Sequence, residues 1–385
     1  MLIAFAALAL TACGGGGSGS TPAADTCTEL SGDSFDCESM LQDIQTQAVS
    51  TVTVLNTEIA TLAQNVTTYC ADVTSTVNAE IAQAQFKSVM NSVQQLEVMQ
   101  FGPIAEFRDE LYVWPSNNTC RADDQMVKLI NGAGETLSSA RSLTAVEYML
   151  FEADTLESCA ENFPTTVGTW KTNTTVLNDR KAARCEYAEF ILDDLVTGVT
   201  DLKTSVDAYD FSTEFSSLQL AANSISDALF YVDKQTKDAK VKAVLPQTTD
   251  GVFTVSKVES QFANTSKANI QNNLIATKAL INAGLDDYLI AKGQQTLVNN
   301  MIAALDTASA NVAAITGELH YVVSSAVAND VEACINTTDC TLAANDLQSF
   351  CALQYSMKAF TDLLKEDFVL ALSFSIPATA DGDND

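Results

Sequence analysis

Histidine is almost absent from this chain of 385 residues, in which His320 is the single example. A catalytic zinc ion normally has three protein ligands, mostly histidine and carboxylate, so such a set cannot be assembled here in the usual way. The motifs His-Glu-x-x-His and Gly-x-Ser-x-Gly are both missing, and a serine triad would depend on His320 alone. His320 lies two residues from Glu318, on a different side of a helix, so the two do not form a ligand pair. The residues therefore disfavour the common hydrolase chemistries.

Positive charge is also scarce. Lysine and arginine together number 20, against 49 aspartates and glutamates, which gives a net charge of −29. Binding to nucleic acid depends on cationic contacts to phosphate, so a nucleic-acid partner is excluded. Anionic lipid surfaces should repel the chain as well. An acidic surface usually serves solubility, although it is also compatible with binding a cation.

A hydrophobic run long enough to span a bilayer is lacking at the start of the chain. Residues 1–12 are apolar apart from Thr11, but they are too few for a membrane-spanning helix. They end at Leu-Thr-Ala-Cys13, which is typical of a lipoprotein signal peptide whose cleavage leaves Cys13 to carry lipid. The glycine- and serine-rich residues 14–20 begin a flexible linker that we place at 13–36, as an anchored protein requires. An ordinary secretory signal is the alternative.

These features predict a protein of the cell envelope of a Gram-negative bacterium, anchored through lipid at Cys13 and facing the periplasm, with the outer membrane as the expected membrane. Ten cysteines fit such an oxidising compartment. Nine remain after Cys13, so at least one stays unpaired if all bonds are internal. We predict Cys334–Cys340 as the first disulfide and Cys27–Cys37 as the second, because each pair flanks a short polar loop; Cys120, Cys159 and Cys185 cannot be assigned. A thiolate metal site is disfavoured because no Cys-x-x-Cys occurs.

The remaining chain predicts an all-α protein. Apolar residues recur every three or four positions over long segments, and only six prolines interrupt them. The polar residues 203–212 suggest a boundary between two halves, each with about four long helices. We therefore predict two packed helical bundles, at 37–205 and 206–375, followed by an acidic disordered tail at 376–385. Within the second half, a helix is expected at roughly 258–291.

One stretch combines helical periodicity with a carboxylate. Leu143, Val146 and Leu150 form an apolar helix face, and Glu147 lies beside it. A carboxylate next to a core costs free energy unless a partner pairs with it. Thr144 precedes Glu147 by three residues, so both side chains can reach the same partner.

The same stretch resembles a known family. Imelysin-like proteins of bacterial envelopes carry Gly-x-His-x-x-Glu followed by apolar residues, and the chain has Ser142, Thr144 and Glu147 at the three motif positions. The glutamate and the apolar continuation match, whereas the glycine and the histidine are replaced. Supporting matches lie at Phe101–Asp123, which contains Tyr-Val-Trp-Pro, and at Arg180–Leu195. Together these segments cover roughly the first half of the chain.

The resemblance implies two helical bundles packed together and either metallopeptidase activity or a role in bacterial iron uptake, with envelope proteins of metal uptake as partners. Because hard cations accept oxygen ligands alone, loss of the histidine does not exclude iron or another divalent or trivalent cation at Glu147. Arg108 could hold an anionic ligand or make a structural salt bridge, and Trp114 could shape the site or close the end of a bundle. The predicted ligand-binding residues are Ser142, Thr144, Glu147, Arg108, Trp114 and Asp123.

Three functions remain open from the sequence. The first is a lipid-anchored protein that binds metal or a ligand for metal acquisition. The second is a metallopeptidase with a degenerate site, and the third is a scaffold or partner-binding lipoprotein without metal. Peptidase activity is disfavoured because Thr144 replaces the motif histidine. The environment of Glu147 discriminates among them: contact with Arg108 or backbone donors alone would make its role structural.

Overall fold

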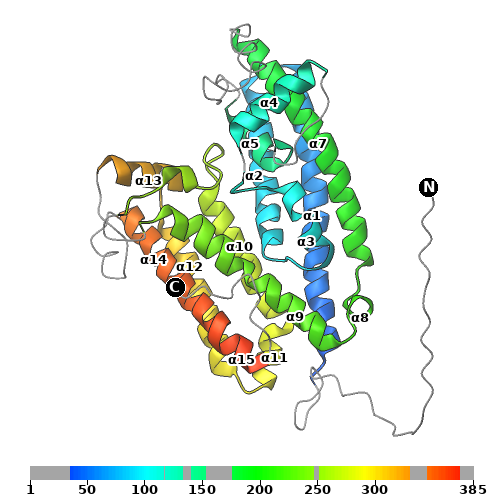
Figure 1. Ribbon diagram of the computed structural model, residues 1–385, viewed down its shortest axis with the longest axis vertical. Coiled ribbons are helices and arrows are strands. Elements are labelled where there is room, and N and C mark those ends of the chain that lie inside the picture. The colour runs from blue at the N-terminus through cyan, green and yellow to red at the C-terminus, as the bar shows by residue number, and fades with distance from the viewer. Residues whose placement is uncertain are drawn as a thin grey trace, which may run out of the picture.

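The computed structural model describes residues 35–116, 118–132, 140–152, 176–246, 251–329 and 345–372. All regular secondary structure in these residues is helical, so the prediction of an all-α protein is confirmed (Figure 1). The predicted signal peptide, Cys13, the linker up to residue 34 and the acidic tail lie outside the described residues. Within the described part of the chain, no helix is both long and apolar enough to cross a membrane.

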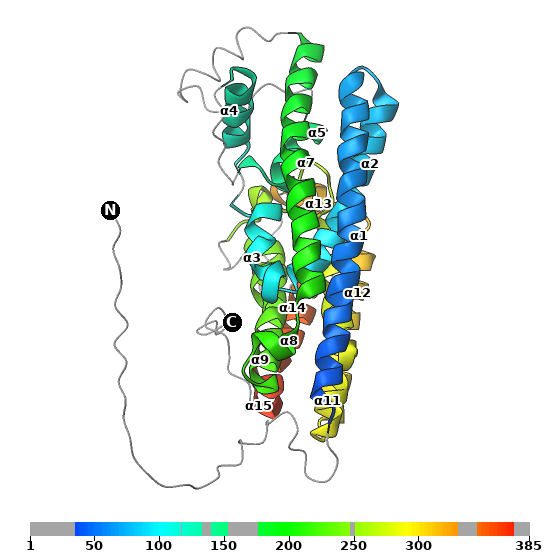
Figure 2. The same cartoon turned by 90° about the vertical axis from the view of Figure 1, so that its right-hand side faces the viewer.

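Three long helices form the frame of the first half: α1 (Cys37–Ala71), α2 (Thr76–Glu97) and α7 (Leu177–Ala208). α1 packs against both α2 and α7, and α1 and α7 run side by side along the long axis (Figure 2). The inward face of α1 is formed by apolar residues at helical spacing, among them Ile44, Leu55 and Leu62, which are all fully buried. The capping carboxylate of Asp36 accepts a hydrogen bond from the Ser39 amide at 2.9 Å and begins the helix.

Shorter helices and a disulfide complete this half. α3 (Gly102–Leu111), α4 (Thr119–Ile130) and α5 (Leu143–Phe151) all pack against α7. A disulfide between Cys70 and Cys185 joins the end of α1 to α7, a pairing that the sequence did not suggest. Cys37, Cys120 and Cys351 are also disulfide-bonded. The predicted Cys334–Cys340 pair and the Cys27 partner predicted for Cys37 lie outside the described residues.

The second half contains shorter and less regular helices. Its core is formed by α10 (Ser266–Leu280), α12 (Gln295–Ala314) and α14 (Asn345–Leu363), with α12 packed between the other two. Around this core lie α8 (Phe211–Glu214), α9 (Leu218–Leu229), the π-helical η2 (Val232–Val241), the short 3-10 turns η3 (Lys242–Val244) and η4 (Val255–Lys257), the π-helical η5 (Ile281–Leu285), α11 (Asp286–Ala291), α13 (Leu319–Ala328), the π-helical η7 (Leu364–Phe368) and α15 (Val369–Leu372).

The helix expected at 258–291 is interrupted in two places. Residues 258–265 form a loop, so the helix begins only at Ser266. At the other end, Gly284 has a φ of +110°, a left-handed conformation that ends the regular α-helix and that glycine adopts readily. In this segment the loop and the left-handed glycine therefore interrupt the helix, although apolar residues continue at helical spacing.

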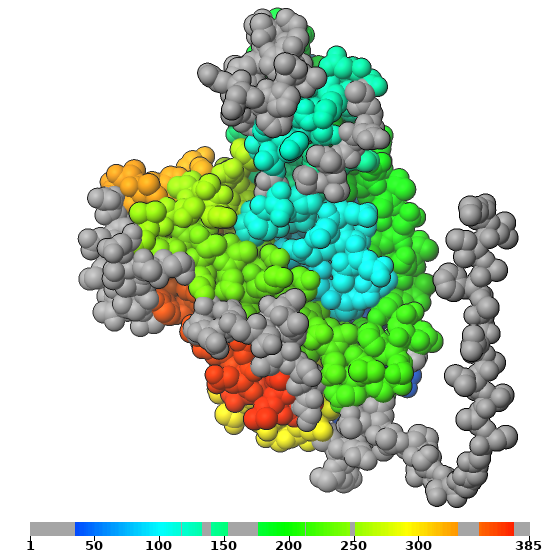
Figure 3. All heavy atoms as spheres, viewed as in Figure 1, coloured from blue at the N-terminus to red at the C-terminus, as the bar shows by residue number. Residues whose placement is uncertain are grey.

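The two halves meet along α2 and α10, which pack against each other. In the space-filling view, the cyan surface around α3 adjoins the green surface of the segments that follow α7 (Figure 3). The predicted boundary between residues 205 and 206 falls in the last turn of α7, and it stays a prediction. The polar residues described next gather where α2, α5 and α10 come together.

Candidate functional site

Glu147 points inward from α5 and holds the backbone of a distant loop. Its side chain is 3% exposed, and its Oε1 accepts hydrogen bonds from the Phe262 amide at 3.1 Å and the Ala263 amide at 2.9 Å. Burial raises the pKa of this carboxyl to about 7, and the negative charge of Glu259 adds to the rise, while the two amide bonds oppose it. Glu147 is thus a buried acid that is poised between its neutral and ionised forms near neutral pH.

The loop that Glu147 holds, residues 258–265, is named here the clamped loop. Two of its residues are in the left-handed region without being glycine: Ser260 at a φ of +45° and Asn264 at +55°. Such conformations are uncommon for residues with a Cβ and persist only when the surroundings fix them. The Asn264 amide donates to the Ser260 carbonyl at 2.8 Å, and the two amides bound by Glu147 lie between these residues. Glu147 therefore fixes the shape of the clamped loop.

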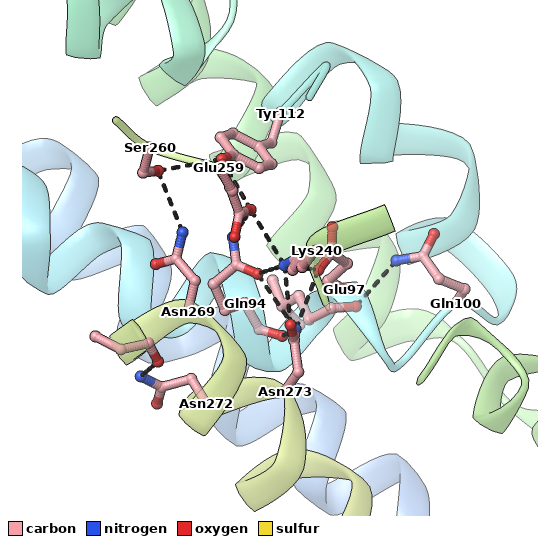
Figure 4. A network of polar contacts seen from close by, with 12 residues as sticks. Gln94, Glu97, Gln100, Tyr112, Lys240, Glu259, Ser260, Asn269, Asn272 and Asn273 are labelled. Carbon is pink, nitrogen blue, oxygen red and sulfur yellow. Dashed lines mark hydrogen bonds and ion pairs between the residues drawn. The ribbon is translucent and has the colours of Figure 1, made fainter. Parts of the chain in front are cut away.

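A second buried feature, the junction network, continues from the clamped loop into the contact between the two halves (Figure 4). At its centre the ammonium group of Lys240 donates to Asn273 Oδ1 at 2.9 Å and lies 3.1 Å from Glu259 Oε1. It also contacts Gln94 and Glu97 on α2. One lysine thus joins carboxylates and amides from α2, α10 and the clamped loop. The members of the network are Gln94, Glu97, Tyr112, Lys240, Glu259, Ser260, Asn269 and Asn273.

The outer part of the network links the lysine to the clamped loop. The Tyr112 hydroxyl donates to Glu259 Oε1 at 2.9 Å, and Asn269 donates to the Ser260 hydroxyl at 3.2 Å. Burial, together with the negative charge of Glu259, raises the pKa of Tyr112 well above its ordinary value, so the phenol stays protonated. Burial also raises the pKa of Glu259, against the opposing effect of Lys240.

Acceptors outnumber donors in this region. Glu97 and Glu259 both pair with Lys240, Glu147 lies near Glu259, and Glu97 Oε1 and Glu259 Oε2 are buried without a hydrogen-bond partner. Buried carboxylates are costly unless paired, which favours the protonated form of Glu147. The signal that sequence reasoning missed is Glu97, which lies between Leu96 and Val98 on a long amphipathic helix, where a charged residue needs a partner; Lys240 lies in a polar segment and gives no such signal.

The other predicted site residues are distributed over separate contacts. Ser142 and Thr144 share a hydrogen bond of 2.8 Å at the start of α5, and both are buried. Asp123 pairs with Arg184 at 3.5 Å and accepts a hydrogen bond from Tyr148 at 2.9 Å, with both charged groups fully buried.

Arg108 and Trp114 lie in different surroundings again. Arg108 pairs with its neighbour Asp109 at 2.8 Å, and its guanidinium lies 5.7 Å from the centre of the Tyr231 ring. Trp114 is buried in the hydrophobic core. The structure therefore brings Ser142 and Thr144 together and places Asp123 with Arg184. Glu147 contacts the amides and the Ser260 side chain of the clamped loop rather than Arg108.

A metal ion held by a protein needs several ligand atoms that converge on one point. In the described ranges, no group of three or more histidine, cysteine, aspartate or glutamate side chains could hold one. The Oε1 atom of Glu147 already accepts two amide hydrogens, which leaves it poorly placed as a ligand. These residues do not fit a metal centre built by the protein alone.

Fold and site define an all-helical protein whose polar residues converge on a buried junction between two sets of helices. A family model described as imelysin, Peptidase_M75, matches residues 48–348, and the chain therefore belongs to the imelysin family. No curated protein matches the chain.

Two solved structures share the fold. An imelysin-like protein from Psychrobacter arcticum aligns with a TM-score of 0.65 and 14% identity, over 89% of this chain and 98% of its own. A protein from Parabacteroides distasonis, assigned as an iron-regulated protein A precursor, aligns with a TM-score of 0.59 and 15% identity, over 87% of this chain and 97% of its own. At such low identity, these similarities show the fold alone.

Proposed function

We propose that this chain is a lipid-anchored, periplasm-facing protein of the Gram-negative envelope that binds a ligand used in metal acquisition, with iron as the first metal to test. The lipid would be attached at Cys13, and the outer membrane is the expected location. Glu147 contacts the backbone amides of the clamped loop, so its own role is structural, and the binding role is supported by the family match and by the structural neighbour described as iron-regulated. The family's motif acid holds the clamped loop through two backbone amides, which suits a positioning role in a binding site rather than the activation of water.

The iron assignment comes from the family and from a structural neighbour that is described as iron-regulated. Because the described residues do not fit a protein-built metal centre, we propose that the metal arrives with ligands of its own, as a chelate. The alternative of a metallopeptidase loses support for the same reason. The alternative of a scaffold without any metal is separated from the binding protein by the retention of iron.

Retention of iron by the mature full-length protein tests this function. We expect equilibrium dialysis against ferric citrate, followed by metal analysis, to show about one iron per chain. Dialysis against a ferric salt without citrate should leave far less iron bound, because the protein lacks a complete ligand set of its own. No retention from either solution would contradict a role in metal binding.

The variant Glu147→Gln distinguishes the two proposed functions, a binding protein and a metallopeptidase. We expect Glu147→Gln to retain iron as the wild type does, because a glutamine carbonyl can accept the same two amide hydrogens. Neither protein should cleave an unfolded protein substrate, with or without a chelator. Cleavage by the wild type that is blocked by a chelator and abolished in Glu147→Gln would favour the metallopeptidase over the binding protein. Loss of iron binding in Glu147→Gln alone would place the metal at Glu147 itself.

A further inference from the structure

The clamped loop is attached to α5 at the position of its buried acid. Glu147 accepts hydrogen bonds from the Phe262 and Ala263 amides. The ring of Phe262 also packs against that of Tyr148, the next residue on α5, with 5.4 Å between the ring centres. Since α10 begins directly after the loop, these contacts join the start of α10 to the side of α5 that carries Glu147.

The groups that face Glu147 do not include a cation. Within the described ranges, Glu147 forms no ion pair. From the clamped loop, the negative charge of Glu259 opposes ionisation, whereas a hydrogen bond from the Ser260 side chain favours it. From the segment after α3 comes the Tyr112 hydroxyl, which donates to Glu259. Lys240 lies 3.1 Å from Glu259 and also pairs with a carboxylate of α2, so its single charge is already shared (Figure 4).

The charged groups on the other helices that pack against α5 are engaged elsewhere. Two ion pairs involve α4 and α7: Arg184 with Asp123, and Lys128 with Asp124. On α2, Lys87 lies over the ring of Phe151, the last residue of α5. A charge on Glu147 would therefore meet one other negative group and three hydrogen-bond donors, but no opposite charge.

The backbone of the clamped loop does not favour the observed shape by itself. Ser260 and Asn264 are both in the left-handed region, which is unfavourable for residues with a Cβ. The two amides that Glu147 binds lie between these residues. Contacts with Glu147 therefore help to offset a conformational cost, and the loop should relax to another shape when they are lost.

Ionisation of Glu147 works against the closed loop. It would place a second negative charge beside Glu259 in a site that is closed to water, although the carboxylate would be well solvated if the loop moved away. Burial raises the pKa of Glu147 from 4.5 to about 7. A group whose pKa is higher in the closed than in the open form stabilises the closed form at low pH and loses that contribution as the pH rises.

Movement of the loop would also change the surface of the protein. A groove of about 410 Å³ lies between α2 and the start of α10, and Asn264 and Thr265, the last two residues of the loop, form part of its wall. They follow directly after the two residues whose amides Glu147 binds. The protonation state of a buried acid can therefore reach this groove through the backbone.

We propose that the clamped loop is a proton-controlled latch between α5 and α10, which is closed while Glu147 carries a proton and opens locally when Glu147 and Glu259 are both charged. Opening lets water reach the junction network and reshapes the groove while the surrounding helices stay folded. The latch needs no metal, so its failure and the failure of the proposed iron role are separate outcomes.

Hydrogen exchange of the metal-free, mature full-length protein, followed by mass spectrometry, tests the latch. After correction for intrinsic exchange rates, the protection of the clamped-loop amides should fall about tenfold from pH 6 to pH 8, because opening releases the proton of Glu147. Low concentrations of urea should change this protection little, since a local opening exposes little surface. Amides of α1 around Leu55, in the core, should stay far more protected at both pH values.

Two variants and one control assign the effect to Glu147. Glu147→Gln cannot ionise, so the loop should be equally protected at pH 6 and pH 8. Ser260→Ala removes a hydrogen bond that favours the charged form, so the loop should begin to open at a higher pH. Glu106→Gln, at an exposed glutamate on α3, should respond as the wild type does.

Three results would overturn the latch. The first is a loop that is as strongly protected as α1 at pH 8, because it would then open only with the whole protein. The second is a fall in protection that Glu147→Gln shares with the wild type. The third is an onset of opening that Ser260→Ala leaves at the wild-type pH.

Discussion

Replacement of Lys240 by methionine is expected to lower the free energy of unfolding by about 3–5 kcal/mol at pH 7.5. Lys240 is 2% exposed and pairs with two buried carboxylates, Glu97 on α2 and Glu259 in the clamped loop. Methionine has a similar length and fills the same space, so the cost arises from charge rather than from a cavity. The substitution would leave both carboxylates buried without their cation, and removing one partner of a buried ion pair is strongly destabilising.

The loss should depend on pH in a defined direction. Burial already raises the pKa of Glu259, and removal of the cation that opposes this rise should raise it further. A carboxyl whose pKa is higher in the folded than in the unfolded state stabilises the fold at low pH and loses that contribution as the pH rises. The variant should therefore recover part of its stability between pH 7.5 and pH 5.

Urea unfolding at several pH values measures this effect. Lys203→Met is the control, because Lys203 forms an ion pair with Asp207 in which both side chains are partly exposed. Such pairs contribute about 0–1 kcal/mol, so this variant should stay close to the wild type. A loss below about 1 kcal/mol in Lys240→Met would mean that the junction network is not a paired electrostatic unit.

The long helices could be predicted because their apolar residues repeat over many turns. The face of α1 through Ile44, Leu55 and Leu62 is buried as its spacing indicates. The burial of Glu147 also follows from the apolar positions around it on α5. At α1 and α5, the local pattern is therefore enough to predict the helix and the depth of a side chain on it.

The partners of the buried groups could not be predicted in the same way. Glu147 binds the amides of Phe262 and Ala263, and a backbone amide leaves no mark in a sequence. Lys240 lies in the π-helical segment η2, in which the 3.6-residue periodicity of an α-helix no longer assigns residues to faces. The bond between Cys70 and Cys185 likewise spans 115 residues, and spacing alone cannot select it among the cysteines.

Glu147→Gln is expected to gain stability relative to the wild type as the pH rises. Glu147 has an ordinary pKa of 4.5 when exposed and a pKa of about 7 in the folded protein. Its contribution to stability is therefore complete below pH 4.5 and is lost as the pH rises to 7, because the buried carboxylate must then ionise. The full change is about 3 kcal/mol, since one pKa unit between the two states corresponds to about 1.4 kcal/mol.

Glutamine stays neutral throughout and keeps a carbonyl oxygen for the two amides, so the variant isolates ionisation from hydrogen bonding. The difference in unfolding free energy at pH 4 measures the amide substitution itself, and the change in that difference up to pH 8 measures the ionisation of Glu147. Glu259, the charged group that faces Glu147, titrates in both proteins and largely cancels. A difference that stays constant from pH 4 to pH 8 would show that Glu147 has nearly the same pKa in the folded and unfolded states, and the clamped loop would then be held at neutral pH by a charged rather than a neutral acid.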